Sequence, residues 1–222
     1  NNLTPVVTGP TVVCPGSTIT LDGPAGFATY SWSPAGNTQS LTVSSAGTYV
    51  LTVTDASGCI GTSAPFVVTA GTTPAPTITG PASFCTGQNI TLTAPAGFAN
   101  YAWSPAGTGQ TLNVTAGGSY AVTVTDADGC VGTSPAFVVT ENPLPTVTIS
   151  GNLSFCTGGN TILTASGSFA NYTWNTGATG STLTVSAAGN YFVTVTDANG
   201  CTGTSAPVTV VENPNPTPAI AG

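Results

Sequence analysis

Residues Gly47–Cys59 read GTYVLTVTDASGC, and this stretch decides the fold of the chain. It returns as GSYAVTVTDADGC at Gly118–Cys130 and as GNYFVTVTDANGC at Gly189–Cys201, and the interval between successive copies is the same. In the first copy, an apolar residue occupies every second position from Tyr49 to Val53. This period of two predicts a β-strand with one buried face. The Asp-Ala-x-Gly sequence that follows predicts a tight turn ending at a cysteine.

The constant interval divides the chain of 222 residues into three similar units. We expect domains at residues 1–73, 74–144 and 145–216, joined by short proline-rich connectors. Residues 217–222 match the first strand of a further repeat, or a strand donated to another subunit. Because a unit of this size buries only a modest core, we expect a covalent cross-link to stabilise each unit.

Each unit contains short apolar stretches separated by turn signals, and none of them has helical periodicity. This pattern is typical of a β-sandwich, so the sequence predicts an all-β chain of three tandem β-sandwich domains arranged as a rod. One tryptophan lies 18 residues after the first cysteine of every unit, as a core anchor would. The predicted core anchors are Trp32, Trp103 and Trp174, together with Tyr49, Tyr120 and Tyr191.

The third unit departs from the other two in its second strand. Ile19 and Ile90 correspond to Thr161, and the isoleucine moves to position 162. Because neighbouring residues of a strand face opposite sides, this shift predicts either a side chain moved across the sheet or a β-bulge.

The six cysteines form two sets that recur with the units. The first and second cysteine of every unit are separated by 45 residues, which is not the close spacing of a zinc site. We therefore expect one disulfide within each unit, and such bonds imply an oxidising compartment outside the cytosol. The expected pairs are Cys14–Cys59, Cys85–Cys130 and Cys156–Cys201.

The charge content excludes several classes of function. The chain has no Lys, Arg or His, and its seven acidic residues give a net charge of −7. It therefore has no electrostatic source for binding nucleic acid or an anionic membrane, and no apolar run suits membrane insertion. Nucleophilic catalysis needs a base beside the nucleophile, and glycoside cleavage needs two convergent carboxylates. Because the sequence indicates neither, we expect no enzyme activity and no cofactor.

Two smaller groups of residues are candidates for binding. Asp126 and Asp128 resemble the start of an oxygen-ligand loop and form a weak calcium candidate. A tight turn is the favoured interpretation, because the other two units have Ser or Asn in place of the second Asp. On the outward face of the main strand, Val50 and Phe192 are predicted to contact another domain or another chain.

Two motifs of the chain resemble those of a known group of proteins. One is Tyr-x-Trp-Ser-Pro-x-Gly at Tyr30–Gly36, and the other is the Gly-x-Tyr stretch that ends in Asp-Ala-x-Gly-Cys. The chain resembles the Ig-like and PKD-like tandem repeats of large secreted cell-surface proteins of Bacteroidota, including adhesins and gliding-motility proteins. The resemblance covers all three units. It implies Ig-like domains, export through an outer-membrane secretion system and display at the cell surface.

Together these observations predict a structural repeat segment of an extracellular fibre or cell-surface adhesin. We expect it to belong to a longer array and to self-associate into filaments, because little charge repulsion opposes side-by-side packing. The alternative is a carbohydrate-binding module array, accessory to a secreted polysaccharide-acting protein, with a cell-surface or glycan ligand. Exposed aromatic side chains would favour that alternative, whereas the core character of the tryptophans favours the structural role.

Overall fold

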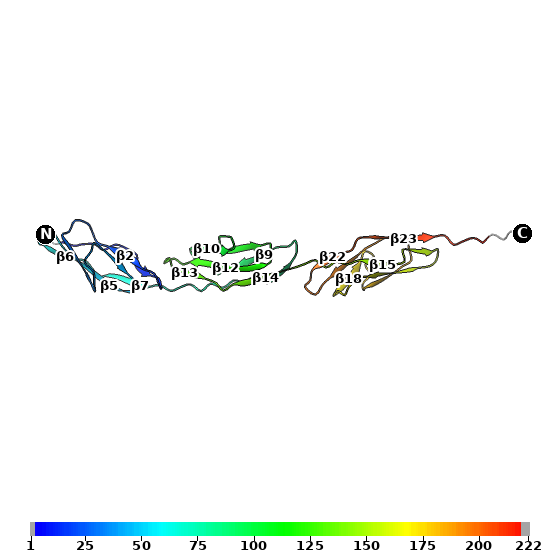
Figure 1. The fold of residues 1–222 in the computed structure, drawn as a ribbon, viewed down its shortest axis with the longest axis horizontal. Coiled ribbons are helices and arrows are strands. Elements are labelled where there is room, and N and C mark those ends of the chain that lie inside the picture. The colour runs from blue at the N-terminus through cyan, green and yellow to red at the C-terminus, as the bar shows by residue number, and fades with distance from the viewer. Residues whose placement is uncertain (1–2, 219–222) are drawn as a thin grey trace. The chain divides into compact units, whose positions relative to one another are not determined.

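The computed structural model describes residues 3–218, and its regular secondary structure there consists of β-strands (Figure 1). Nothing in this range is a helix long and apolar enough to cross a membrane. The strands of the first repeat are β1 (Val12–Val13), β2 (Ile19–Asp22), β3 (Thr29–Ser33), β4 (Ser40–Val43), β5 (Gly47–Thr54), β6 (Ile60–Thr62) and β7 (Phe66–Ala70).

The later repeats contain the corresponding strands. Those of the second are β8 (Ser83–Cys85), β9 (Ile90–Thr93), β10 (Asn100–Ser104), β11 (Thr111–Val114), β12 (Gly118–Thr125), β13 (Val131–Thr133) and β14 (Phe137–Asn142). Those of the third are β15 (Ile149–Gly151), β16 (Ser154–Cys156), β17 (Thr161–Ala165), β18 (Asn171–Trp174), β19 (Thr182–Val185), β20 (Gly189–Tyr191), β21 (Val193–Thr196), β22 (Thr202–Thr204) and β23 (Val208–Asn213).

By their internal contacts, the residues form two compact units. One contains the first repeat with Thr91–Leu112 and Ser119–Phe137, and the other contains Pro81–Ile90, Asn113–Gly118 and the chain from Val138 onward. The division passes through the second repeat. The domain bounds predicted from the repeat, and the predicted rod, therefore stay predictions. Of the predicted extra strand at residues 217–222, the last four lie outside the described residues.

The first repeat folds into two facing sheets. One sheet has the order β1-β7-β5-β3, with β6 also paired to β5, and the other contains β2 and β4. β1 runs parallel to β7, whereas the other pairs are antiparallel. The register places Trp32 opposite Leu51 in the larger sheet and Leu21 opposite Leu41 in the smaller one.

The core of this repeat lies between the two sheets. Trp32, Leu51 and Val53 of the larger sheet are buried in one cluster with Leu21 and Val43 of the smaller sheet. Along β5, buried side chains alternate with partly exposed ones, as the sequence predicts. Two facing sheets around such a core form the predicted Ig-like β-sandwich.

The third repeat has the same architecture and a core of its own. Its sheets have the orders β15-β17-β19, β16-β23-β20 and β18-β21-β22. β16 runs parallel to β23, as β1 does to β7. The most deeply buried members of the core include Leu163, Trp174, Val193, Val195 and Val210.

The second repeat shows the same strand pairs. β10 and β13 pair with β12, β9 pairs with β11, and β8 runs parallel to β14. The chain is therefore all-β and built from tandem β-sandwiches. The buried positions of this repeat match those of the others and include Leu92, Trp103, Val122, Val124 and Val139.

A buried serine bridges a break in the last strand of each repeat. Between β6 and β7, the Ser63 hydroxyl accepts a hydrogen bond from the Leu51 N–H at 3.0 Å and donates one to the Ala64 carbonyl at 2.8 Å. Ser134 and Ser205 accept the corresponding backbone bond in their repeats. Because the hydroxyl satisfies a backbone donor that the interrupted strand leaves unpaired, the main strand stays buried across the break.

The irregular second strand of the third repeat contains no bulge. β17 keeps the register of β2, with Thr161 opposite Val185. Thr161 is buried and donates its hydroxyl to the Asn152 carbonyl at 2.7 Å, while Ile162 is 56% exposed. Of the two alternatives that the sequence left open, the structure has the isoleucine on the outer face of the sheet.

Candidate functional site

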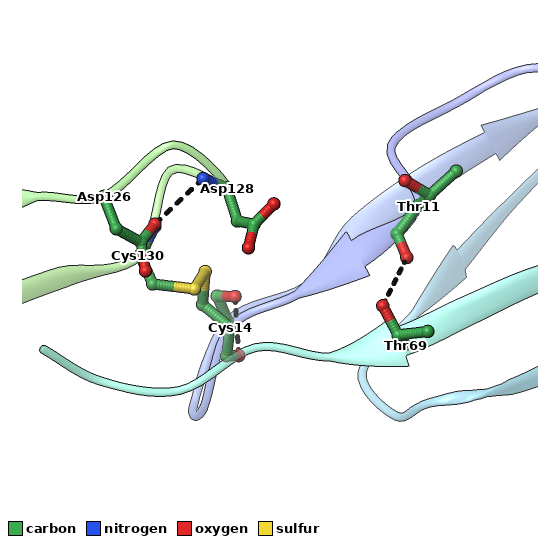
Figure 2. The surroundings of a disulfide bond; sticks show 7 residues. Thr11, Cys14, Thr69, Asp126, Asp128 and Cys130 are labelled. Carbon is green, nitrogen blue, oxygen red and sulfur yellow. Dashed lines mark hydrogen bonds between the residues drawn. A yellow bond between two sulfur atoms is a disulfide. The ribbon is translucent and has the colours of Figure 1, made fainter. Parts of the chain in front are cut away.

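The first cysteine of a repeat lies at the end of the last strand. Cys14 follows β1, and parallel pairing places Val13 opposite Ala70, the last residue of β7. The Thr69 N–H and hydroxyl both donate to the Thr11 carbonyl, at 2.8 and 3.2 Å (Figure 2). These bonds hold the first cysteine at the point where the chain leaves its repeat.

The second cysteine ends the turn after the main strand. Asp126 Oδ1 accepts hydrogen bonds from the N–H groups of Asp128 at 3.0 Å, drawn in Figure 2, and of Cys130 at 2.8 Å. The Asp126 N–H donates to the Cys130 carbonyl at 3.0 Å, which closes the turn from the other side. Asp197 and Cys201 repeat this arrangement. The carboxylate therefore fixes the backbone that presents the thiol.

The connector between repeats passes close to this second cysteine. It crosses β13 at Gly132, where an added Cβ would lie 1.8 Å from the Pro74 carbonyl oxygen. Gly61 and Gly203 are approached by the chain backbone in the same way. Glycine is needed at these positions because any side chain would collide with the connector backbone. The second cysteine thus lies where the chain comes into its repeat.

The two positions meet in disulfides that join successive repeats. Cys14 is bonded to Cys130 with a Cα–Cα distance of 5.4 Å (Figure 2), and Cys85 is bonded to Cys201 with 5.6 Å. Each bond has a sequence separation of 116 residues and lies within one compact unit. Gly71 borders the first bond, since a Cβ there would lie 2.6 Å from Cys130 Sγ.

The pairing predicted within each repeat is therefore wrong. In the first repeat, Cys14 lies beyond the Gly47 end of β5 and Cys59 lies beyond the Thr54 end. β5 has eight residues, which at about 3.3 Å per residue separates its two ends by roughly 23 Å. A disulfide requires Cα atoms about 4.4–6.8 Å apart. The structure contradicts the pairs Cys14–Cys59, Cys85–Cys130 and Cys156–Cys201, and has Cys14–Cys130 and Cys85–Cys201 in their place.

Two cysteines are unbonded and exposed, namely Cys59 and Cys156. Cys59 is equivalent to Cys130 and Cys201, which are bonded to the preceding repeat. Cys156 is equivalent to the two cysteines that are bonded to the following repeat.

The predicted core anchors are buried, and their polar atoms have partners. The three tryptophans are 1–4% exposed, and each indole Nε1 donates to the backbone carbonyl six residues later at 2.9–3.0 Å. The Tyr49 and Tyr191 hydroxyls donate to the carbonyl four residues earlier at 2.8 Å, and Tyr120 is buried as well. This tyrosine bond is the tyrosine corner of Ig-like sandwiches. The buried residues are Trp32, Trp103, Trp174, Tyr49, Tyr120 and Tyr191.

The predicted outward contact residues differ in exposure. Phe192 is 39% exposed, and Val50 is partly buried. Phe192 lies between β20 and β21, where its N–H donates to Asn175 Oδ1 at 3.2 Å and its carbonyl accepts from the Asn175 N–H at 3.0 Å. A partner for this face stays a prediction.

Of the acidic turn residues in the second repeat, Asp126 accepts hydrogen bonds from the backbone. Asp126 and Asp128 are the weak calcium candidate, and Asp126 uses one carboxylate oxygen to accept two backbone N–H bonds. In residues 3–218, no group of three or more His, Cys, Asp and Glu side chains could hold a metal ion. In the first repeat, hydrogen bonds from the Ser57 hydroxyl and then from the Cys59 N–H hold the pKa of Asp55 below its ordinary value.

A shallow groove of about 440 Å³ lies on the third repeat. Asn171, Tyr172 and Thr173 line it from β18, and Phe169 lines it from the preceding loop. The Phe169 and Tyr172 rings meet edge to face with their centroids 5.8 Å apart. The Tyr172 hydroxyl donates to the Gly167 carbonyl at 2.9 Å. The groove therefore offers polar groups beside an aromatic edge.

Comparisons with solved structures find other β-sandwich proteins at low identity. The fibronectin(III)-like modules of Clostridium thermocellum CbhA are 12% identical over 61% of this chain and 95% of theirs, with a TM-score of 0.37. Domains 3–5 of the Drosophila OTK extracellular region are 13% identical over 95% of each chain, with a TM-score of 0.34.

A third likeness is to SGBP-B of the Bacteroides ovatus mixed-linkage glucan utilization locus, in complex with a mixed-linkage heptasaccharide. It is 16% identical over 96% of this chain and 71% of that one, with a TM-score of 0.24. No family model and no curated protein matches the chain.

Proposed function

We propose that this chain is a load-bearing structural segment of an extracellular fibre or cell-surface adhesin, and not an enzyme. The observation that carries the proposal is that both disulfides join one repeat to the next. A disulfide within one domain stabilises only that domain. A disulfide between successive repeats also resists their separation when the chain is pulled from its ends.

The bonds shorten the covalent path through the chain. From Cys14 the path crosses to Cys130, returns along the backbone to Cys85 and crosses to Cys201. Without the bonds, the path from Cys14 to Cys201 follows every residue of the backbone between them. At about 3.5 Å per extended residue, the bonded path limits their separation to roughly 160 Å, against roughly 650 Å for the reduced chain.

Charge and surface composition support self-association into filaments. Only seven of the 222 residues carry a charged side chain, so the charge density that opposes contact between copies is low. Several large apolar side chains are exposed and are suited to lateral contacts. They include Ile60, Val67, Val138, Ile162 and Phe192.

An extracellular location is supported by the same disulfides, because such bonds persist in oxidising compartments. We further propose that the chain belongs to the secreted cell-surface proteins of Bacteroidota, on the basis of the motifs at Tyr30–Gly36 and Gly47–Cys59.

Single-molecule stretching tests the load-bearing role. A chain held by its two termini and pulled to full extension should be roughly 500 Å shorter when oxidised than after reduction, because the bonded path is the shorter one. The double variant C59S/C156S is the matched control, since it removes only unbonded thiols and should stretch like the oxidised wild type. Equal extensions with and without reductant would contradict the proposal.

Imaging of the assembly tests the filament. We expect fibres that grow with concentration and show an axial repeat on the order of 30–45 Å per domain, or a multiple of it. Sedimentation of a monomer at all concentrations would contradict self-association. The Phe192→Ser variant should weaken assembly if its exposed ring lies between copies.

The second candidate function is carbohydrate binding, and the groove at Tyr172 favours it. Its aromatic edge and polar lining are suited to a sugar ring. Titration with neutral polysaccharides, compared with a Tyr172→Ala variant, tests this candidate. Binding that is lost in the variant would support carbohydrate binding at this groove. The absence of binding to any glycan would contradict it.

A further inference from the structure

The unbonded Cys59 is held in the same conformation as its bonded equivalents. The Cys59 N–H donates to Asp55 Oδ1 at 2.9 Å, as the Cys130 N–H donates to Asp126 at 2.8 Å. The Asp55 N–H also donates to the Cys59 carbonyl at 3.0 Å, the same distance as in the bonded turn. The turn that presents the thiol is therefore formed without a disulfide.

The unbonded Cys156 is likewise presented as its bonded equivalent is. It lies opposite Asn213 in the parallel pair of β16 and β23, and Cys85 lies opposite Asn142 in the pair of β8 and β14. In both repeats the next threonine donates its N–H to that asparagine carbonyl, at 2.9 Å after Cys156 and at 2.8 Å after Cys85. The backbone around Cys156 therefore has the same pairing as that around the bonded Cys85, although Cys156 has no disulfide.

We propose that Cys156 of one copy of this segment and Cys59 of a second copy form a disulfide, so that copies of the segment are joined head to tail. The proposal rests on the proposed function as a structural array and deepens it by naming the joint. The two internal bonds each join a first-position cysteine to the second-position cysteine of the next repeat. Cys156 and Cys59 are the first-position and second-position cysteines that have no such bond.

In the second copy, the backbone next to Cys59 is arranged as it is next to Cys130 at the internal joint. At the internal joint, the Pro74 backbone lies over Gly132 next to the bonded Cys130. In the first repeat, the backbone of Leu3 already lies over Gly61 in the same manner. The backbone beside Cys59 is therefore covered as it is beside the bonded Cys130.

The chemistry is a thiol–disulfide exchange. The Cys156 thiolate attacks a small disulfide oxidant and forms a mixed disulfide, releasing one reduced thiol of the oxidant. The Cys59 thiolate of the second copy then attacks the Cys156 sulfur and releases the other. Two protein thiols are oxidised to one disulfide, and one oxidant disulfide is reduced to two thiols.

Complementary single variants test the joint. In a glutathione redox buffer, wild-type chains should form a ladder of linear oligomers on a non-reducing gel, whereas C59S alone and C156S alone should stay monomeric. A mixture of C59S and C156S should form dimers and no larger species, because each partner has only one reactive end. Peptide mapping of the dimer should find Cys156 bonded to Cys59.

Homodimers of either variant in the same yield as the mixed dimer would show undirected oxidation and overturn the proposal. Absence of the mixed dimer would overturn it as well. The double variant C59S/C156S checks the fold, since it should retain Cys14–Cys130 and Cys85–Cys201 with an unchanged circular dichroism spectrum.

The same samples separate this inference from the proposed function. If wild-type chains assemble into fibres but the mixed dimer does not form, only the disulfide joint is wrong. If the mixed dimer forms with the expected bond but no fibre is seen, the joint stands and the filament proposal fails.

Discussion

Cys14 is bonded to Cys130 of the following repeat, with Cα atoms 5.4 Å apart. Cys59, the second cysteine of its own repeat, lies beyond the other end of β5. Because the main strand separates the two cysteines of every repeat, a bond can form only between repeats. The disulfides therefore contribute to the connection between sandwiches rather than to the closure of each one.

A non-reducing peptide map should contain the pairs Cys14–Cys130 and Cys85–Cys201. Trypsin has no site in a chain without Lys or Arg, so cleavage after aromatic residues is the suitable method. Aromatic residues lie between all neighbouring cysteines, which makes each pair distinguishable by mass. A peptide joining Cys14 to Cys59 would contradict the structure.

The Cys14→Ser variant should be less stable by up to about 4–5 kcal/mol, because the lost bond closes a long loop in the unfolded chain. Urea unfolding followed by circular dichroism measures the difference. Cys59→Ser is the matched control, since that thiol is exposed and unbonded. It should change the free energy of unfolding by less than about 0.5 kcal/mol. Equal losses in both variants would argue against the bond.

The Gly132→Ala variant should lose about 1–3 kcal/mol of stability, because its methyl group would overlap the Pro74 carbonyl and force the connector away. The matched control is Gly47→Ala in β5, where the nearest atoms to an added Cβ are 3.6 Å away in ordinary contact. Thermal unfolding of both variants gives the comparison. A Gly132→Ala melting curve equal to that of the control would show that the connector does not lie against β13.

The Trp174→Ala variant should cost about 3–5 kcal/mol, because it empties the core of the third repeat and leaves the Gly180 carbonyl without its indole donor. Trp174 is 1% exposed and donates to Gly180 at 3.0 Å. The control is Ile162→Thr, which restores on the outer face the residue type found at Thr20 and is expected to be nearly neutral. Urea unfolding that ranks these two variants in the opposite order would contradict the placement of both residues.

The pKa of Asp55 should be measurably below its ordinary value of 3.8, mainly because the Ser57 hydroxyl donates to the carboxylate. A group whose pKa is lowered by folding contributes stability that is fully present above its unfolded value. That contribution is lost as the pH falls through the lowered folded pKa. Carboxyl NMR titration measures the pKa, and Ser57→Ala should return it toward 3.8. An unchanged pKa in that variant would exclude the hydroxyl as the main cause.

Much of each domain could be predicted from the sequence alone. The alternation around Tyr49 and Val53 indicated the main strand, and the constant position of Trp32 and its equivalents indicated the core. These features are local, because whether a side chain is buried in a strand follows from a period of two. The sequence also indicated that Asp126 belongs to a turn, whereas the serine and glycine contacts at Ser63 and Gly132 were missed. Their recurrence at the same place in every repeat was the signal that could have found them.

The pairing of cysteines was decided only by the tertiary structure. The constant spacing of 45 residues between Cys14 and Cys59 reflects the repeat itself and says nothing about distance in space. The parallel pairing of β1 with β7 places Cys14 at one end of the sandwich, and the antiparallel course of β5 carries Cys59 to the other. Such pairing depends on contacts between strands at opposite ends of a repeat's sequence, as between Val12 and Thr69. Local patterns therefore determined the sandwich of each repeat, and only the fold could show that the bonds join one repeat to the next.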